Sequence, residues 1–378
     1  MPDEVLIPDR RALTRLFPAL RLFGAIRQAF DLRKLLIAAL GLALLQPGWT
    51  LLDRLVPAAA GTTPDLFAQS VSAKSVSEPD FWSWETVSGL HFRLSEPVRL
   101  LVAPLFALVE PGARWGRMIH ALLSVIWLIA VWGICGGAIS RIAIVRAATT
   151  RQTRSIDALR FALANAGPLI LAPLCPLFGI AICALFGATF GLLYRLPVVG
   201  PAIAGIGLIF PLVAGLVMTL LLAGLAAGWP LLQAATAGGA EDALDALSRI
   251  YGYVNQRLGS YAALVALAWL GGMLGLALVD QLTFGIIRLT HWSLSLTASI
   301  ALTESFFGSP PTTSSTIAGA THAFWLGVVR LIAHGWIFSF FWTAAAYLYL
   351  WLRLDVDGSP WDEIEPHRPE GLSITARA

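Results

Sequence analysis

The sequence predicts an all-α protein, a polytopic transmembrane helical bundle of about six spans with interfacial amphipathic helices. Three observations predict this class. Of the 378 residues, 57% are hydrophobic and only 13% are charged, against about 25% charged residues in an ordinary soluble domain. The mean hydropathy is +0.73. Charges gather in a few segments, so that Arg195 is the single charged residue between Arg160 and Glu241. Apolar stretches of this length are expected in a lipid bilayer.

The first third of the chain holds one span and one long loop. Residues 1–34 alternate arginines with leucine, isoleucine and phenylalanine, which predicts a cytoplasmic amphipathic basic segment on a membrane surface. The apolar run 35–56 is the first transmembrane span. Residues 57–116 form an extracytoplasmic loop, and its apolar part, 98–109, is too short to cross and is expected as an interfacial helix.

Residues 117–282 form the core transmembrane bundle, with spans two to five expected at 118–139, 168–193, 202–228 and 258–279. Span three, residues 168–193, contains Pro168, Pro173 and Pro176. Proline frees backbone carbonyls, which hydrocarbon tolerates only where protein or water satisfies them, so this run either crosses in a bent form or re-enters. An extracytoplasmic loop at 283–328, a sixth span at 329–352 and a cytoplasmic tail at 353–378 complete the chain.

The distribution of arginine and lysine predicts the orientation. With both termini cytoplasmic, the interior segments hold 17 of the 26 basic residues. They lie before the first span, in the elbow 141–160 and at Arg249, Arg257, Arg353, Arg368 and Arg377. The expected setting is the bacterial inner membrane.

The segments between spans two and three and between spans four and five resemble each other. They contain the runs 155–161 and 245–251. One interpretation is a parallel internal repeat, as in some transporters. The other is that any short cytoplasmic helix needs an acid near its start and arginine on its wet face.

Small residues recur four positions apart on four spans and predict close helix contacts. The pairs are Gly133/Gly137, Gly187/Gly191, Gly224/Gly228 and Gly271/Gly275. Tryptophans near the predicted span ends indicate an aromatic belt. These are Trp49, Trp82, Trp84, Trp115, Trp229, Trp292, Trp325 and Trp351.

Several function classes find no support in the sequence. The net charge of +3 comes without a dense basic stripe, which argues against nucleic acid as a partner. No phosphate-binding loop, dinucleotide fingerprint, zinc helix or nucleophile elbow occurs, so we expect no enzyme and no cofactor. The three cysteines lie in apolar runs without ligand spacing, and we expect no metal site.

One group of ionisable residues is a candidate polar vestibule: Asp280, Arg288, Arg330 and His334. Arg330 and His334 are one helical turn apart, near the outer end of the sixth span, and the other two lie beyond the fifth span. The functional interpretation is a solute-binding or gating site in which Asp280 pairs with Arg330 and His334 titrates. The alternative is that these residues snorkel to the interface as ordinary span ends.

Four segments resemble an uncharacterised family of bacterial multi-pass integral membrane proteins. They are residues 93–108, 136–143, 196–201 and 245–254, within a similarity that covers about residues 80–265. The family has no assigned activity or site residues. The resemblance therefore implies a multi-pass fold and a bacterial inner-membrane setting.

The leading hypothesis is a non-enzymatic structural or assembly component of an inner-membrane complex. Its expected partners are the lipid bilayer and other membrane subunits or a second copy of the chain. The alternative is a permease or channel-like transporter of a small or lipid-like solute. The repeat, the proline-rich span and the candidate vestibule are the features that favour transport.

Overall fold

The computed structural model describes residues 19–56, 84–108, 110, 112, 114–149, 151–197, 199–240, 242–298 and 317–361. Every regular element within these ranges is a helix, and six helices are long and apolar enough to cross a membrane. The predicted class is therefore confirmed. The predictions for residues 1–18, for part of the predicted loop 57–116 (residues 57–83), for part of the predicted loop 283–328 (residues 299–316) and for the tail from 362 lie outside the described residues.

The six candidate spans follow the predicted order. They are α3 (Leu32–Leu55), α6 (Trp115–Thr149), α8 (Ala166–Leu193), α10 (Ile209–Ala237), α12 (Leu258–Ser295) and α14 (Ile317–Asp357). Shorter helices connect them: α2 (Ala19–Ala29), α4 (Trp84–Leu94), α5 (Glu96–Leu108), α7 (Ser155–Ala164), α9 (Val199–Ile206) and α11 (Ala243–Gln256). Several helices extend well past their predicted apolar run, α12 by sixteen residues.

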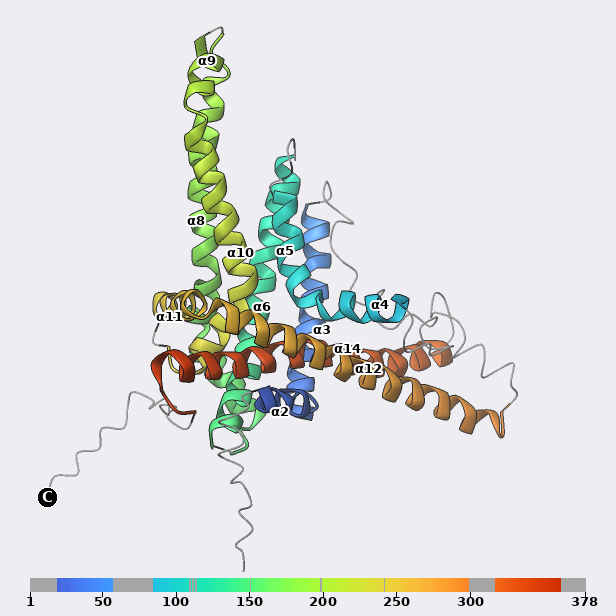
Figure 1. Cartoon of the computed structure of the whole chain (residues 1–378). Helices are drawn as coiled ribbons and strands as arrows, with labels where there is room; N and C mark the ends of the chain where they lie inside the picture. The colour runs from blue at the N-terminus through green and yellow to red at the C-terminus, as the bar shows by residue number, and fades with distance from the viewer. Residues whose placement is uncertain are drawn as a thin grey trace, which may run out of the picture.

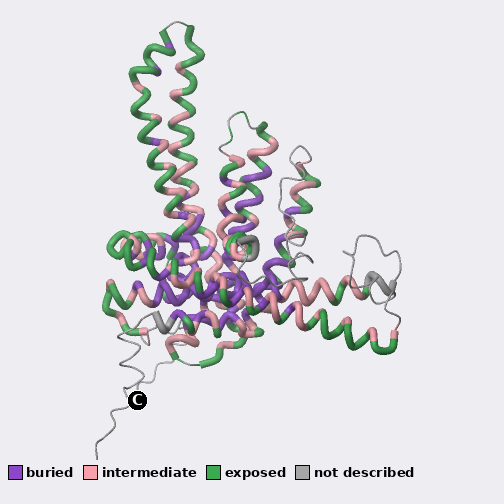
Figure 2. Tube along the Cα trace, turned by 45° about the vertical axis from the view of Figure 1, so that its right-hand side comes forward, coloured by how far each residue is buried: buried purple, intermediate pink, exposed green. Residues whose placement is uncertain are grey.

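The six long helices do not run parallel to one another. Helices α3, α6, α8 and α10 stand side by side, while α12 and α14 form a pair that runs crosswise at their base (Figure 1). The tip of the α8–α10 pair lies at one end of the molecule, and α2 and α7 lie at the other. Buried residues concentrate where the two groups cross, and the projecting ends are exposed (Figure 2).

Helix α14 forms the centre of this core. From Ala333 to Leu350 every residue except Phe341 is buried, as expected for a helix that is apolar on all sides. The ring of Trp132 from α6 stacks on Phe338 with a centroid separation of 4.3 Å, and Trp229 from α10 meets Trp342 edge to face at 5.1 Å. These aromatic contacts join three long helices at one point.

The aromatic-belt prediction is wrong for two of the tryptophans. Trp49 and Trp229 are each 1% exposed and belong to the core. In contrast, Trp115, Trp292 and Trp325 are exposed, as a belt requires. The sequence does not separate the two groups, because a tryptophan near a span end also faces inward where a neighbouring helix crosses.

The proline-rich third span is one continuous helix, α8, which contains Pro173 and Pro176. Proline at position 173 cannot donate to the carbonyl of Leu169, four residues earlier. The buried side chain of Gln233 on α10 donates to that carbonyl instead, at 2.8 Å. A neighbouring helix thus satisfies a carbonyl that proline frees, and α8 continues through the prolines.

Residues 98–108 of the predicted interfacial helix belong to α5, which stands upright against α6 (Figure 1). Its inner face is buried through Glu96, Pro97, Leu100, Leu101 and Leu105. The short helix α4, next to α12, leads into it. Residues 84–108 therefore enter the protein and turn back along α6.

Most of the predicted glycine contacts are present. A Cβ at Gly137 would lie 2.8 Å from Leu169, and one at Gly271 would lie 2.9 Å from Ile26. Gly275 packs directly against Trp336, and Gly224 against Tyr251. The exception is the pair Gly187/Gly191, where an added Cβ would meet nothing within 4 Å.

Candidate functional site

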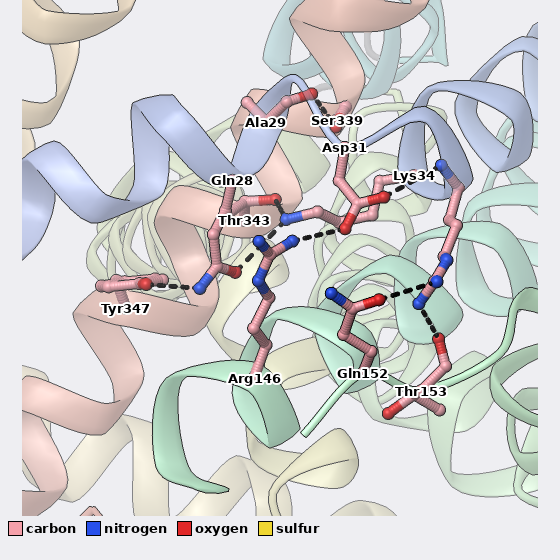
Figure 3. Close-up of polar contacts among 11 residues, drawn as sticks. Gln28, Ala29, Asp31, Lys34, Arg146, Gln152, Thr153, Ser339, Thr343 and Tyr347 are labelled. Carbon is pink, nitrogen blue, oxygen red and sulfur yellow. Dashed lines mark hydrogen bonds and ion pairs between the residues drawn. The ribbon is translucent and has the colours of Figure 1, made fainter. Parts of the chain in front are cut away.

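The corner between α2 and α3 buries a lysine. Asp31 caps α3 by accepting from the backbone N–H of Arg33, which starts the helix directly after α2. In the first turn of α3, Lys34 is 0% exposed. Its Nζ donates to Thr343 Oγ1 at 3.0 Å and to Gln28 Oε1 at 3.4 Å (Figure 3). Both acceptors are neutral, and no carboxylate among the described residues hydrogen-bonds to this amino group.

Further polar contacts surround this lysine and connect α14 to α2. Gln28 Nε2 donates to the hydroxyl of Tyr347 at 2.7 Å, and Ser339 Oγ donates to the backbone carbonyl of Ala29 at 2.9 Å (Figure 3). We call Gln28, Lys34, Thr343 and Tyr347 the Lys34 cluster. Its four side chains come from three helices, and α14 contributes two of them one turn apart.

Two arginines complete the surroundings of the Lys34 cluster. Arg146 of α6 forms an ion pair with Asp31 at 2.6 Å. The carboxylate closest to Lys34 in the sequence is therefore paired with this arginine. Arg33 points away from the lysine and donates to the carbonyl of Thr153 at 3.0 Å and to Gln152 Oε1 at 2.9 Å (Figure 3). The cluster holds α2, α3 and α14 together, and the Asp31–Arg146 ion pair attaches α6 to this corner. Buried hydrogen bonds of this kind fix the register of the helices that carry them.

A second polar group lies where α4 and α5 meet the crosswise pair. Glu96, at the start of α5, contacts His334 of α14 with 3.0 Å between Oε1 and Nε2, and both side chains are 4% exposed. Arg93, at the end of α4, pairs with Asp280 of α12 at 2.6 Å. We call Arg93, Glu96, Asp280 and His334 the α4–α5 cluster.

The structure brings together only two of the four predicted vestibule residues. Asp280 and His334 both belong to the α4–α5 cluster. The predicted pairing of Asp280 with Arg330 is wrong, because Arg93 occupies the carboxylate. Arg288 is exposed on α12 and forms no ion pair with any residue that the structure describes. Arg330 is half-buried, and its Nε lacks a hydrogen-bond partner within the described ranges.

The α4–α5 cluster leaves several buried polar atoms without hydrogen-bond partners among the described residues. They are Arg93 Nε and Nη2, Asp280 Oδ1 and His334 Nδ1. Nearby, the guanidinium of Arg99 lies 3.4 Å from the centre of the Phe92 ring. Burial lowers the pKa of Arg99, and the carboxylate of Glu96 opposes this shift. This group is therefore less completely paired than the Lys34 cluster.

Two observations bear on ligands. A cavity of about 340 Å³ lies between α12 and α14, lined by Ile286, Ile287, Thr290, Leu294, Thr321, His322, Trp325, Leu326 and Val329. Its lining is mainly apolar, and its volume falls in the range of about 300–1,000 Å³ that is usual for small-molecule sites. Within the described part of the chain, no group of three or more His, Cys, Asp or Glu side chains is arranged to hold a metal ion.

Sequence reasoning missed Lys34, Arg93 and Glu96. Lys34 follows Arg33 at the end of a basic segment. Nothing in the sequence pattern shows that the lysine is buried while the arginine reaches toward the surface. Arg93 and Glu96 lie in the predicted outer loop. The available signal was their position immediately before the apolar run at 98–109, since a charge next to a short apolar helix enters the protein when that helix does.

These features define an integral, multi-pass helical membrane protein with a core closed by polar contacts. The chain matches no protein-family model, no curated protein and no solved structure. The resemblance to an uncharacterised bacterial membrane family accordingly stays a prediction.

Proposed function

We propose that this protein is a non-enzymatic structural or assembly component of a membrane complex. The observation that carries the proposal is the exposed α8–α10 arm, the outer part of these two helices with α9 at its tip (residues 178–197 and 199–220), where α8 and α10 pair with each other and extend beyond the core (Figures 1 and 2). Large apolar side chains are uncovered there: Phe178 is 72% exposed, Leu185 is 69% exposed and Ile206 is 86% exposed. Such a surface suits lipid or the helices of another subunit.

The contrast between arm and core supports this role. The Lys34 cluster and the Asp31–Arg146 ion pair hold α2, α3, α6 and α14 in one arrangement, and α10 packs against α6 and α14, so the arm projects from a fixed base. A scaffold needs such a base, whereas an enzyme needs a reactive group that a substrate reaches. We also propose that the protein lies in the bacterial inner membrane, as the resemblance implies, with both termini in the cytoplasm, because the basic residues concentrate on that side of the predicted topology.

Purification of the tagged, full-length protein in mild detergent tests the proposal. We expect native mass spectrometry to show a stoichiometric second subunit or a second copy. An arm variant, Phe178→Ala/Leu185→Ala/Leu212→Ala, keeps the surface apolar and able to insert, but it removes the shape that a partner would contact. The partner should be lost from this variant.

The matched control is Leu274→Ala/Leu278→Ala/Leu282→Ala on α12, where three leucines are also exposed. This control should keep the partner. A wild-type protein that purifies alone as a monomer, or equal loss of the partner from both variants, contradicts the proposal.

The cavity between α12 and α14 favours a second candidate function, a permease for a lipid-like solute. Its apolar lining suits an acyl chain, and Arg288 and Arg330 directly follow the lining residues Ile287 and Val329. Dodecanoic acid should then raise the thermal midpoint of the wild-type protein. Val329→Trp fills the cavity and should abolish the shift. Equal shifts in wild type and variant would exclude this cavity as the solute site.

A further inference from the structure

The elbow that joins α6 to α7 carries an exposed basic and apolar surface. We define it by Arg151, Arg154, Ile156, Arg160 and Leu163. All three arginines are exposed, Ile156 is 62% exposed and Leu163 is 59% exposed. Positions 156, 160 and 163 of α7 are four and three residues apart, so they share one face of the helix.

Contacts on the other side of the elbow hold this surface in place. Ala158 and Ala162 of α7 are 0% exposed and pack into the core. The guanidinium of Arg141 lies 4.5 Å from the centre of the Phe161 ring. Arg33 donates to the two loop residues Gln152 and Thr153 (Figure 3). Arg151 and Arg154 flank that clamped pair, so the loop presents both of them outward.

The charge of the elbow is strongly unbalanced. Asp157 is the only acidic residue between Ala147 and Asn165. None of Arg151, Arg154 and Arg160 forms an ion pair with a residue in the described ranges. Three free guanidinium groups therefore lie beside two uncovered aliphatic side chains. A cationic helix with exposed apolar residues is typical of a segment that rests at the level of lipid headgroups.

We propose that this elbow binds the headgroups of anionic phospholipids. Guanidinium groups match phosphate oxygens in a bidentate geometry, and the negative leaflet surface attracts basic segments beside a span. Ile156 and Leu163 then lie against the upper acyl chains. An acidic protein segment would also pair with the arginines, but it would leave the two aliphatic side chains unexplained. A bilayer surface accounts for both, and this proposal does not depend on the function proposed above.

The test compares full-length variants purified in mild detergent and supplied with phosphatidylglycerol or phosphatidylcholine. Native mass spectrometry counts the retained lipids. The elbow variant is Arg151→Gln/Arg154→Gln/Arg160→Gln. The matched control is Arg54→Gln/Arg114→Gln/Arg195→Gln, which removes three exposed charges at the opposite end of the predicted topology. We expect wild type and control to retain phosphatidylglycerol in preference to phosphatidylcholine. The elbow variant should lose most of the phosphatidylglycerol and its preference.

A third variant, Arg151→Lys/Arg154→Lys/Arg160→Lys, guards against misfolding as the cause. It keeps the charge and should retain more phosphatidylglycerol than the glutamine variant. Unchanged retention in the elbow variant would overturn the proposal, and so would equal loss in the control, which indicates a general charge effect. Loss of a co-purifying acidic protein, with lipid retention intact, would assign the elbow to that partner and also overturn it.

Discussion

Lys34 is the residue whose burial demands the most of its neighbours. Its amino group has no contact with solvent, and its two hydrogen-bond acceptors are neutral oxygens from α2 and α14. A hydrogen bond contributes about 0.5–1.5 kcal/mol net, and a buried donor left without its acceptor costs about 1–3 kcal/mol. The stability of the largely apolar core therefore depends on two polar acceptors, the oxygens of Thr343 and Gln28.

Replacing Thr343 by valine tests this dependence. The valine keeps the volume but removes the acceptor at 3.0 Å from Nζ. We expect Thr343→Val to lower the free energy of unfolding by about 1–3 kcal/mol, measured in detergent by chemical or thermal denaturation. In a Lys34→Met background the same substitution should cost less, because no buried amino group then needs the acceptor.

Thr219→Val is the matched control for this experiment. Thr219 is exposed on α10 and its hydroxyl donates only to the carbonyl of Gly215, so its loss should change stability by less than about 0.5 kcal/mol. Equal costs at positions 343 and 219, or an unchanged cost in the Lys34→Met background, would contradict the role assigned to Thr343.

At the scale of single residues, the sequence identified two of the four members of the α4–α5 cluster. Asp280 and His334 stand out because an ionisable residue near membrane depth is unusual. Their partners are 187 and 238 residues away in the chain. Such pairings are set by which helices pack together, and an apolar pattern does not contain that information. For the same reason the predicted Asp280–Arg330 pair, chosen from neighbouring spans, is wrong.

Among the elements, α8 illustrates how a helix tolerates internal prolines. The interaction of Gln233 with the carbonyl of Leu169 compensates for the donor that Pro173 lacks. This compensation predicts energetic coupling between positions 173 and 233. Gln233→Met should destabilise the protein more in the presence of Pro173 than in a Pro173→Ala background, where the alanine N–H can donate to Leu169. A double-mutant cycle of unfolding free energies measures the coupling, which we expect to be about 1 kcal/mol or more.

The corresponding cycle between Pro176→Ala and Gln233→Met is the control. Pro176 frees the carbonyl of Ala172, to which Gln233 makes no hydrogen bond. This second cycle should show little coupling. Comparable coupling in both cycles would indicate a general effect of proline on α8 and not a specific hydrogen bond.

The contact between α6 and α14 gives a second prediction at this scale. A Cβ at Gly136 would lie 2.6 Å from the indole of Trp342, which Trp132 and Trp229 hold from two sides. Gly136→Ala should therefore lower stability by about 1–3 kcal/mol through overpacking. Gly187→Ala, where the added Cβ meets nothing, should be neutral or stabilising by up to about 1 kcal/mol. Thermal unfolding in detergent measures both, and destabilisation of similar size would refute the difference in packing.

The extent of each element was less predictable than its existence. Apolar content located all six long helices, because every span must exclude charge. It did not give their ends: α12 continues through Asp280 and Arg288 to Ser295, since an ionisable residue does not interrupt backbone hydrogen bonding. The upright position of α5 was also missed, because segment length alone does not say whether a short apolar helix lies on the surface or inside.

For the whole molecule, the crosswise position of α12 and α14 makes the number of membrane crossings a testable property. The predicted topology places Arg195 and Ser295 on the outer side and Gln152 on the inner side. Single cysteines at these positions, in a chain with Cys135, Cys175 and Cys183 replaced by alanine, test this arrangement. A membrane-impermeant maleimide should label positions 195 and 295 in intact cells.

Position 152 serves as the internal control and should react only after the membrane is opened. Labelling of position 295 together with 152 would mean that α12 does not cross the bilayer, and the count of six crossings would then fail. Labelling of 152 in intact cells, with 195 protected, would reverse the orientation inferred from the arginines.

The contact between the first and last long helices has a consequence for biosynthesis. Lys34 and Thr343 are 309 residues apart in the chain. At about 5–20 residues per second, a ribosome needs on the order of 15–60 s to make the intervening segment. During that interval the amino group of Lys34 on α3 lacks its acceptor on α14, because Thr343 has not yet been made. A truncated chain that ends before α14 never contains Thr343. The core can therefore be completed only after translation has reached the last long helix.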